Sequence, residues 1–360
     1  MNEPQNDSEI QSLIKDSAQV LAVGNQTKPP LCAVENATLV SLRKLTGIIE
    51  YEPSEFTFTA RAGTPVSEIA AALAEKNQYL PFDPMLVASG ATLGGTVASG
   101  LAGPGRFRYG GVRDFLLGVK FVAGDGAVIN AGGKVVKNAA GFDIPKFLVG
   151  SLGRLGVMTE MTFKVFPLPI AARTLQLQCS SHQQAMERMS IAAASRWELD
   201  AIDYRPRQSI VAIRLRGPQV ANDALATDIQ SKWGNDVSDF DAADSWWASI
   251  IGLDWEPEHR VAIKVACTPQ QCATLTDSLP DSAVVHWSVA GNVLWILAKD
   301  EASLPQIEAS LIASKLPALV VRGSTQKPCI GAWPDREING LVKSAMDPAS
   351  KFPCAESKAS

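Results

Sequence analysis

Apolar and polar residues alternate over residues 56–62, where phenylalanine or alanine occupies every second position and threonine or arginine lies between. This period of two predicts a half-buried strand that starts at Phe56. The apolar run at 20–23 predicts a buried strand that leads into a polar loop at Gly24. Further strand-like runs, several of them next to glycine, follow within residues 116–167, and short strands interrupted by glycine are typical of a sheet with ligand-facing loops.

The residues after 62 have helical spacing. Thr64 is expected to cap a helix and Pro65 to occupy its first position. Asn77 is expected to end it. The apolar face of this helix would be formed by Val66, Ile69, Ala70 and Leu73. The pattern therefore predicts a strand, a turn and an amphipathic helix.

The pattern changes at the proline-rich segment 166–169, "FPLP". Downstream, residues 171–321 combine helical spacing with strand runs and lack glycine-rich loops. Mixed helices and strands on both sides of this segment predict an α+β protein of two domains. We expect a first domain at 1–170, a smaller α+β cap domain at 171–321, and a C-terminal segment at 322–360 that can return to the first domain.

Composition limits the classes of function. The 360-residue chain is 46% hydrophobic and 19% charged, as in globular proteins, and its net charge of -4 argues against a nucleic-acid surface. No signal peptide or membrane-spanning run is present, so a cytoplasmic protein is expected, with association to a membrane through partners left open. The six cysteines are scattered and have no neighbouring histidine, so no metal site is predicted.

Glycine is concentrated in one part of the chain, because 17 of the 27 glycines lie within residues 90–156. Glycine occurs where the backbone needs a positive φ or where a ligand approaches it closely. Residues 90–100, "GATLGGTVASG", combine two adjacent glycines with the hydroxyl groups of Thr92 and Ser99. Such a segment suits a diphosphate, although it matches neither a Walker loop nor the G-x-G-x-x-G fingerprint.

Three further segments carry candidate chemistry. "VGNQT" at 23–27 follows a strand and can form an anion-binding nest, with a plain turn as the alternative. "RFRYGGVRD" at 106–114 supplies three arginines, with a solvated loop in which Arg113 pairs with Asp114 as the alternative. Residues 132–160 add "KNAAG" and, just before a strand, "GSLGRLGV".

Taken in order, these segments resemble the FAD-binding domain of the vanillyl-alcohol oxidase and p-cresol methylhydroxylase (PCMH) superfamily. The ordered set "ATLGG", "RYGGVRD", "GGKVVKNAAGFD", "GSLGRLGVMTE" and "FPLP" carries the resemblance, which covers roughly residues 20–169. Within the superfamily the match is to the E-type subunits of glycolate oxidase, whose patterns include A-T-x-G-G, G-L-A-G-P and V-K-N-x-A-G-[YF]-D. The resemblance implies a PCMH-type domain of two α+β subdomains that hold FAD between them in an extended form.

The resemblance also implies which residues contact FAD, and it assigns no catalytic residue. The first diphosphate loop would be Val23, Gly24, Asn25, Gln26 and Thr27. The second would be Gly90, Ala91, Thr92, Gly94 and Gly95, continued toward the flavin ring by Ala98, Ser99 and Gly103. Arg108, Tyr109 and Gly110 would border the isoalloxazine, and Gly156 and Val157 would meet the adenine or the flavin. Pro84, Lys137 and Asn138 complete the set.

Three departures from the family patterns restrict the function. Covalent flavin in this superfamily commonly uses a histidine in or near the first loop, whereas the first histidine here is His182, so non-covalent FAD is expected. The cap region lacks H-G-H-x-G-D-G-N, the motif of catalytic 2-hydroxy-acid dehydrogenases, so no substrate base is assigned. The family ending D-P-x-x-x-x-N-P-G begins at Asp347 but loses Asn-Pro-Gly, which leaves the return of the C-terminus to the flavin edge open.

The resemblance implies a subunit of a glycolate oxidase or dehydrogenase complex, with a homologous FAD-binding subunit and an iron–sulfur subunit as partners. Such a chain would take part in the oxidation of glycolate, a small 2-hydroxy acid, to glyoxylate and pass electrons to its partners. The missing histidines favour electron transfer or assembly over an independent active site. Two alternatives stay open: a stand-alone FAD-dependent oxidoreductase of another hydroxy acid or alcohol, and a flavin-free scaffold, against which the intact "ATLGG" and "GSLGRLGVMTE" argue.

Overall fold

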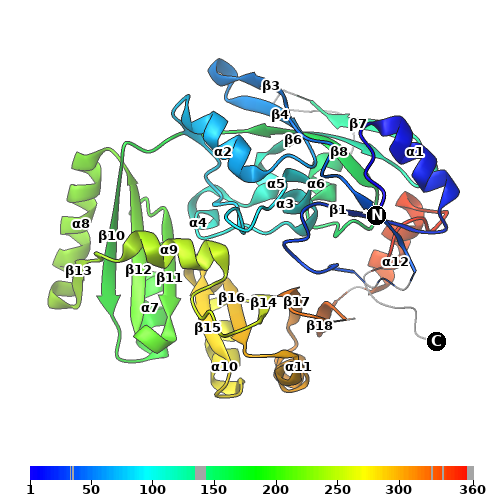
Figure 1. The fold of residues 1–360 in the computed structure, drawn as a ribbon. Helices are drawn as coiled ribbons and strands as arrows, with labels where there is room; N and C mark the ends of the chain where they lie inside the picture. The colour runs from blue at the N-terminus through cyan, green and yellow to red at the C-terminus, as the bar shows by residue number, and fades with distance from the viewer. Residues whose placement is uncertain (33, 35, 134–142, 326, 335, 355–360) are drawn as a thin grey trace.

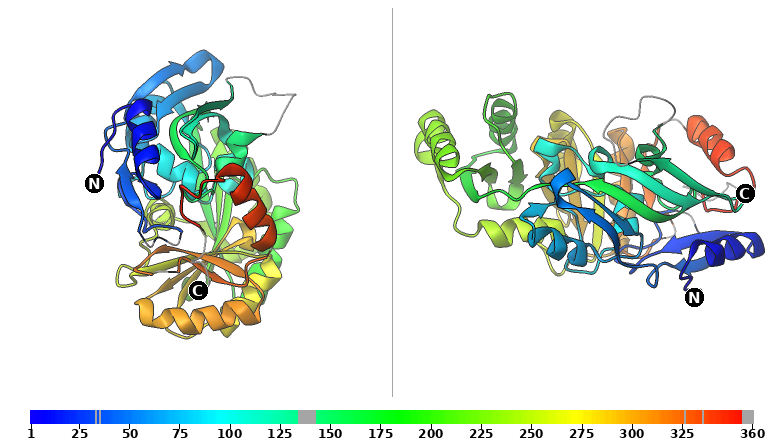
Figure 2. Two further views of the ribbon diagram at one scale, coloured as in Figure 1. Left: turned by 90° about the vertical axis from the view of Figure 1, so that its right-hand side faces the viewer. Right: turned by 90° about the horizontal axis from the view of Figure 1, so that it is seen from above.

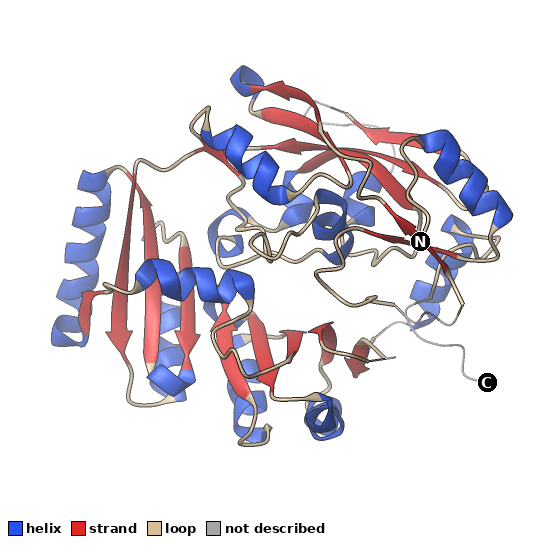
Figure 3. Ribbon diagram, viewed as in Figure 1, coloured by secondary structure: helices blue, strands red, loops and turns tan. Residues whose placement is uncertain are grey.

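The computed structural model describes residues 1–360 except 33, 35, 134–142, 326, 335 and 355–360. The predictions for Lys137 and Asn138 therefore lie outside the described residues. The chain folds into two groups of sheets and helices, which Figure 1 places at upper right and lower left and Figure 3 separates into helices and strands. In the described part of the chain, no helix combines the length and apolarity needed to cross a membrane.

The N-terminal part contains a two-stranded parallel sheet and a five-stranded antiparallel sheet. The parallel pair is β1 (Val20–Val23) and β2 (Thr38–Ser41). The larger sheet has the order β3-β4-β8-β6-β7, from β3 (Ile48–Glu52), β4 (Thr57–Arg61), β6 (Leu116–Val122), β7 (Val128–Gly132) and β8 (Val157–Lys164). The helices are α1 (Asp7–Asp16), α2 (Val66–Ala74), α3 (Leu93–Ser99), α4 (Arg106–Tyr109), α5 (Val112–Phe115) and α6 (Ile144–Leu148). Short strands β5 (Gln78–Tyr79) and β9 (Phe166–Pro167) pair beside them.

The predicted strand and helix around residue 60 are present, but their boundaries differ from the prediction. Phe56 has a left-handed backbone, φ 54°, and is 39% exposed, because it closes the 3-10 turn at 53–55 rather than starting β4. Pro65, without a side-chain cap, precedes α2. The hydroxyl of Thr64 instead accepts a hydrogen bond from Gly47 N–H at 3.0 Å. Ala70 is exposed, so the buried face of α2 consists of its three larger apolar residues.

The segment from 171 to 331 forms one nine-stranded antiparallel sheet of two halves that share the order β-α-β-β-α-β. The first half is β10 (Ala171–Gln178), α7 (His182–Ala193), β11 (Ala201–Arg205), β12 (Ile210–Gly217), α8 (Gln219–Trp233) and β13 (Val237–Asp239). The second is β14 (Val261–Ala266), α10 (Pro269–Ser278), β15 (Val284–Ser288), β16 (Val293–Ala298), α11 (Leu304–Ala313) and β17 (Pro317–Arg322). The halves meet at the centre of the sheet, where Tyr204 of β11 lies opposite Trp287 of β15.

The two faces of this sheet have different partners. Helices α7, α8, α10 and α11 bury one face in a hydrophobic cluster that includes Trp287 and Met189. The opposite face carries α9 (Ala243–Gly252) and contributes Trp295 and Leu297 to the core of the N-terminal part. Figure 2 (left) shows the N-terminal sheets above the nine-stranded sheet and α11 on its far side.

The C-terminal segment packs against the N-terminal part. After β18 (Cys329–Gly331) and α12 (Arg336–Met346), the chain reaches β1, where Val20 N–H donates to Lys351 O at 2.7 Å. Phe352 is fully buried in the N-terminal core. The two ends of the chain therefore share one core with the glycine-rich region.

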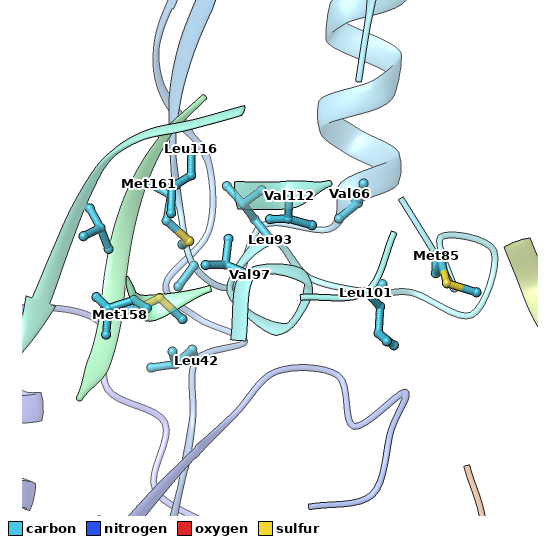
Figure 4. Packing of buried hydrophobic residues seen from close by; sticks show 14 of the residues in the cluster. Leu42, Val66, Met85, Leu93, Val97, Leu101, Val112, Leu116, Met158 and Met161 are labelled. Carbon is cyan, nitrogen blue, oxygen red and sulfur yellow. The ribbon is translucent and has the colours of Figure 1, made fainter. Parts of the chain in front are cut away.

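Helix α3 is held by large apolar side chains from several elements. Leu93 and Val97 project from it into the cluster that contains Met158 and Met161 of β8, as Figure 4 shows. All four side chains are at most 6% exposed. This packing fixes the glycine-rich start of α3 relative to β1 and β8.

Candidate cofactor-binding site

A cavity of about 260 Å³ lies where the two sheets of the N-terminal part meet. Its walls are the turn at 24–28 after β1, helix α3, and the loop at 152–156 before β8. Apolar side chains such as Leu42 and Met158 close the remaining sides. Three segments that are far apart in the sequence are thus brought together at one cavity.

The two segments with predicted diphosphate contacts touch each other directly. The Asn25 side-chain amide donates to Gly90 O at 2.8 Å, which ties the first turn to the start of the second segment. A Cβ added at Gly24 would lie 2.2 Å from Thr92 Oγ1, so glycine is required for this close approach. Gln26 has φ 53°, and its left-handed backbone closes the turn.

The first turn presents unpaired donors. Among the described residues, none accepts a hydrogen bond from the backbone N–H groups of residues 24–28. These residues are half-buried, except for Gln26, which is exposed, so their N–H groups are accessible and can donate to an acceptor-rich ligand. Successive free N–H groups in a turn are the donor arrangement that binds phosphate oxygens.

Most donors of the second segment are engaged within the protein. Gly94 N–H donates to Ala62 O at 2.8 Å, and Gly95 N–H donates to Thr92 Oγ1 at 3.3 Å, so neither amide is free. Ser99 Oγ donates to Gly95 O at 2.8 Å and is likewise engaged within α3. The Ser99 hydroxyl and both glycine amides therefore donate within the protein, whereas no hydrogen bond from the Thr92 hydroxyl to a described residue is formed, and this hydroxyl stays a candidate donor to the ligand.

Most of the residues predicted to contact FAD lie in the cavity wall or at the interface with the nine-stranded sheet. The predicted residues that line the cavity are Val23, Gly24, Asn25, Gln26, Thr27, Thr92, Gly94, Gly95, Ala98, Ser99 and Gly156. Gly90, Ala91 and Val157 adjoin them in the sequence. Pro84, Gly103, Arg108, Tyr109 and Gly110 are not part of the wall.

The arginine-rich segment faces the nine-stranded sheet. Arg108 forms an ion pair with Glu198 at 2.7 Å, and Tyr109 packs edge-on against Phe166 with 5.5 Å between ring centroids. Asp114 accepts a hydrogen bond from Gly111 N–H at 2.8 Å and is not paired with Arg113, which is exposed. The Arg113–Asp114 pair considered as an alternative is therefore not formed.

A buried ionic cluster between the two parts of the molecule was not predicted from the sequence. Arg214 of β12 pairs with Asp83 and with Asp200, and all three side chains are at most 8% exposed. Burial alone would raise the pKa of Asp83, but Arg214 and Arg216 outweigh burial and lower it. Burial raises the pKa of Asp200, and the same two arginines offset this rise only in part. Such a cluster is assembled from distant segments and leaves no local pattern.

Sequence analysis also missed Lys28, which directly follows the predicted turn and lines the cavity. Its Nζ donates to Thr27 Oγ1 at 3.2 Å. Burial lowers the pKa of Lys28 to about 8. The cavity wall contains no carboxylate among its described residues. Free N–H groups, one lysine and apolar walls fit an anionic ligand with a diphosphate and flat rings.

Family comparison agrees with this chemistry. Residues 2–132 match the family described as "FAD binding domain". The fold is similar to that of p-cresol methylhydroxylase with substrate bound, with a TM-score of 0.72 at 14% identity over 96% of this chain and 86% of that chain. Residues 2–132 therefore match an FAD-binding domain, and the fold of the chain is of the PCMH type. The predictions of the fold class and of FAD as the cofactor are confirmed.

The names of the curated relatives refer to 2-hydroxy acids. Glycolate oxidase subunit GlcE of Escherichia coli K12 is 39% identical over 194 residues, which are 54% of this chain and 54% of that protein. Glycolate oxidase subunit GlcD of Bacillus subtilis is 26% identical over 51% of this chain and 38% of its own length. A D-2-hydroxyglutarate dehydrogenase of Xanthomonas citri pv. viticola is 25% identical over 79% of this chain and 69% of its own length. The chain thus spans about half, or less, of the two glycolate oxidase subunits.

Proposed function

We propose that this chain is an FAD-binding subunit of a complex that oxidises a small 2-hydroxy acid, with glycolate as the first candidate. The observation that carries the proposal is the 39% identity to a glycolate oxidase subunit, GlcE. The names of the other relatives, D-lactate and D-2-hydroxyglutarate dehydrogenases, share the same substrate class. The relative named GlcD supports a homologous subunit as one partner, and the family resemblance suggests an iron–sulfur subunit as another.

The described residues suggest how FAD would be held. The N–H groups of residues 24–28 and the Thr92 hydroxyl would bind the diphosphate, and the missing side chain of Gly95 would leave room beside them. Ala98 and Gly156 would form the wall along which the rest of the dinucleotide extends. The first 181 residues contain no histidine, which supports a non-covalent cofactor. When bound, FAD would supply the acceptor for the two electrons removed from the hydroxy acid.

The histidines of this chain support a role in electron transfer or assembly. The His286 side chain is fully buried and bonds to Asp203 Oδ2 at 2.8 Å. His182 bonds to the hydroxyl of Tyr204, a residue of the cluster on the helix-covered face of the sheet. Neither of these imidazoles nor that of His259 is among the described residues that line the cavity. A base that removes the substrate proton is therefore expected on a partner chain.

Purification of the tagged full-length chain from its native cell tests the proposal. We expect stoichiometric co-purification of a second chain that is homologous to this one, a chain with cysteine-rich cluster motifs, and FAD that denaturation releases. Purification as a colourless single chain that FAD cannot reconstitute would contradict the proposal and favour the flavin-free scaffold.

A stand-alone FAD-dependent oxidoreductase is the second candidate. The similarity to a D-2-hydroxyglutarate dehydrogenase over 79% of this chain, a relative whose name mentions no subunit, supports it. Steady-state turnover of a hydroxy acid by the isolated chain with an artificial electron acceptor would favour this candidate over the partner-dependent one.

A further inference from the structure

The cavity wall contains a single ionisable side chain among its described residues. Lys28 lies at the end of the turn whose N–H groups are unpaired, and the other lining residues are apolar, glycine or uncharged polar. The Lys28 ammonium bonds only to the Thr27 hydroxyl, at 3.2 Å, and has no carboxylate partner in the described part of the chain. A partly desolvated cation therefore faces a cavity without a counter-charge.

The ionisable groups on the neighbouring described segments are cationic, paired with each other or neutral, so none supplies that counter-charge. On the loop before β8, Arg154 Nε donates to Ser151 O at 3.0 Å. On α12, Lys343 pairs with Asp347. Burial raises the pKa of the nearby Cys32 thiol to about 12, so this thiol stays neutral. Burial of an uncompensated charge destabilises a fold, and a site that retains one is suited to a ligand of the opposite charge.

We propose that Lys28 is the counter-ion of the FAD diphosphate and neutralises one of its two negative charges. This inference rests on the proposed placement of FAD in the cavity. Backbone N–H groups can hydrogen-bond phosphate oxygens but carry no net charge, so a cation beside them reduces the net charge that the diphosphate brings into the cavity. The Thr27 hydroxyl holds the Lys28 ammonium at the wall, next to the N–H groups of the turn.

The proposal predicts that FAD binding takes up a proton. Because burial lowers the pKa of Lys28 to about 8, this side chain is only partly protonated near that pH in the apo-protein. A diphosphate beside the ammonium favours the charged form and raises its pKa. Proton uptake should therefore accompany binding between about pH 8 and 9, and FAD affinity should fall as the pH rises through this range.

Three variants of the full-length apo-protein test the inference. Lys28→Met removes the charge at similar length, Lys28→Arg keeps a charge at every working pH, and Lys76→Met, an exposed lysine just after α2, is the matched control. FAD affinity and proton uptake are measured by calorimetry in two buffers of different ionisation enthalpy. We expect Lys28→Met to bind FAD about 10- to 100-fold more weakly and to lose the proton uptake. Lys28→Arg should bind more tightly than Lys28→Met, without the uptake, and Lys76→Met should match the wild type.

Thermal unfolding of the apo-proteins separates a ligand-binding role from a structural one. A half-buried lysine without a carboxylate partner does not stabilise the empty fold, so apo Lys28→Met should melt at or above the wild-type temperature. A lower melting temperature, or wild-type FAD affinity with unchanged proton uptake, would overturn the inference. If Gly95→Val loses FAD while Lys28→Met retains it, only the proposed role of Lys28 is wrong. If both variants retain FAD, the proposed placement of FAD in this cavity is wrong.

Discussion

The two adjacent glycines at the start of α3 have different physical roles. A Cβ at Gly94 would lie 3.0 Å from both the Cβ and the carbonyl oxygen of Ala62, whereas a Cβ at Gly95 would meet only Thr92 Oγ1, at 3.2 Å. Gly94 therefore serves the packing of α3, and Gly95 keeps the cavity wall open. Sequence alone predicts that glycine is needed at both positions but cannot tell packing from ligand approach, because the neighbour of Gly94 is 32 residues away in the sequence.

Valine substitutions should separate these roles. Gly94→Val is expected to lower the free energy of unfolding of the apo-protein by about 1–3 kcal/mol, because the added atoms overpack the contact with Ala62. Gly95→Val should change apo stability less and should abolish FAD retention. Denaturant unfolding of both variants and flavin content after gel filtration check this. A wild-type flavin content in Gly95→Val would contradict the assignment of Gly95 to the cavity wall.

Strand β12 is joined to the N-terminal part by ion pairs as well as by apolar contacts. Replacement of Arg214 by methionine would leave Asp83 and Asp200 buried with only the longer contacts to Arg216, so the free energy of unfolding should fall by about 3–5 kcal/mol. Arg216 is 22% exposed and contacts the same carboxylates at 3.5 and 3.8 Å, so Arg216→Met should cost clearly less. Urea unfolding measures both, and equal losses would contradict the central role of Arg214.

Strand β15 should make stability depend on pH through His286. This imidazole lies between Trp246 and Trp255, with ring-centroid distances of 5.2 and 5.5 Å. Burial lowers its pKa below the ordinary value of 6.5, and the attraction of Asp203 does not offset burial. The unfolded state therefore binds more protons in this range, and stability should fall as the pH drops below about 6.5, by at most about 1.4 kcal/mol per pH unit.

Unfolding in denaturant at two pH values, above and below this range, checks the effect. His286→Gln should show a smaller difference in stability between the two values than the wild type, because glutamine does not titrate. An equal difference in both proteins would assign the pH dependence to other groups.

Elements with a strong local pattern could be predicted, but the distant segments that they pack against or bond to could not. The alternation over 56–62 predicted the strand observed as β4, and the helical spacing after Pro65 predicted α2. The first residue of β4 was wrong because Phe56 adopts a left-handed backbone, and the Thr64 cap was wrong because its hydroxyl bonds to the distant Gly47. The two halves of the nine-stranded sheet share an order of elements but no repeated string, so their equivalence emerges only from the strand pairing.

At the scale of the whole molecule, the two parts share one hydrophobic core. Trp295 and Leu253 from the segment after residue 171 and Phe352 from the C-terminal segment are all buried with the apolar residues around α3. Motifs in the sequence were sufficient to predict the FAD-binding domain. They also predicted an anion-binding nest at 23–27, with a plain turn as the alternative. They did not predict Lys28 as the charged part of the cavity, because its place there depends on burial that only the fold sets.

Anaerobic titration with glycolate, followed by the visible absorbance of bound flavin, tests the central claim most directly. It is carried out on the isolated chain reconstituted with FAD and on the complex purified from the native cell. We predict that the flavin of the isolated chain stays oxidised and that the flavin of the complex is bleached. A complex that stays oxidised with every 2-hydroxy acid tried would contradict the substrate class, and rapid bleaching of the isolated chain would contradict its dependence on partners.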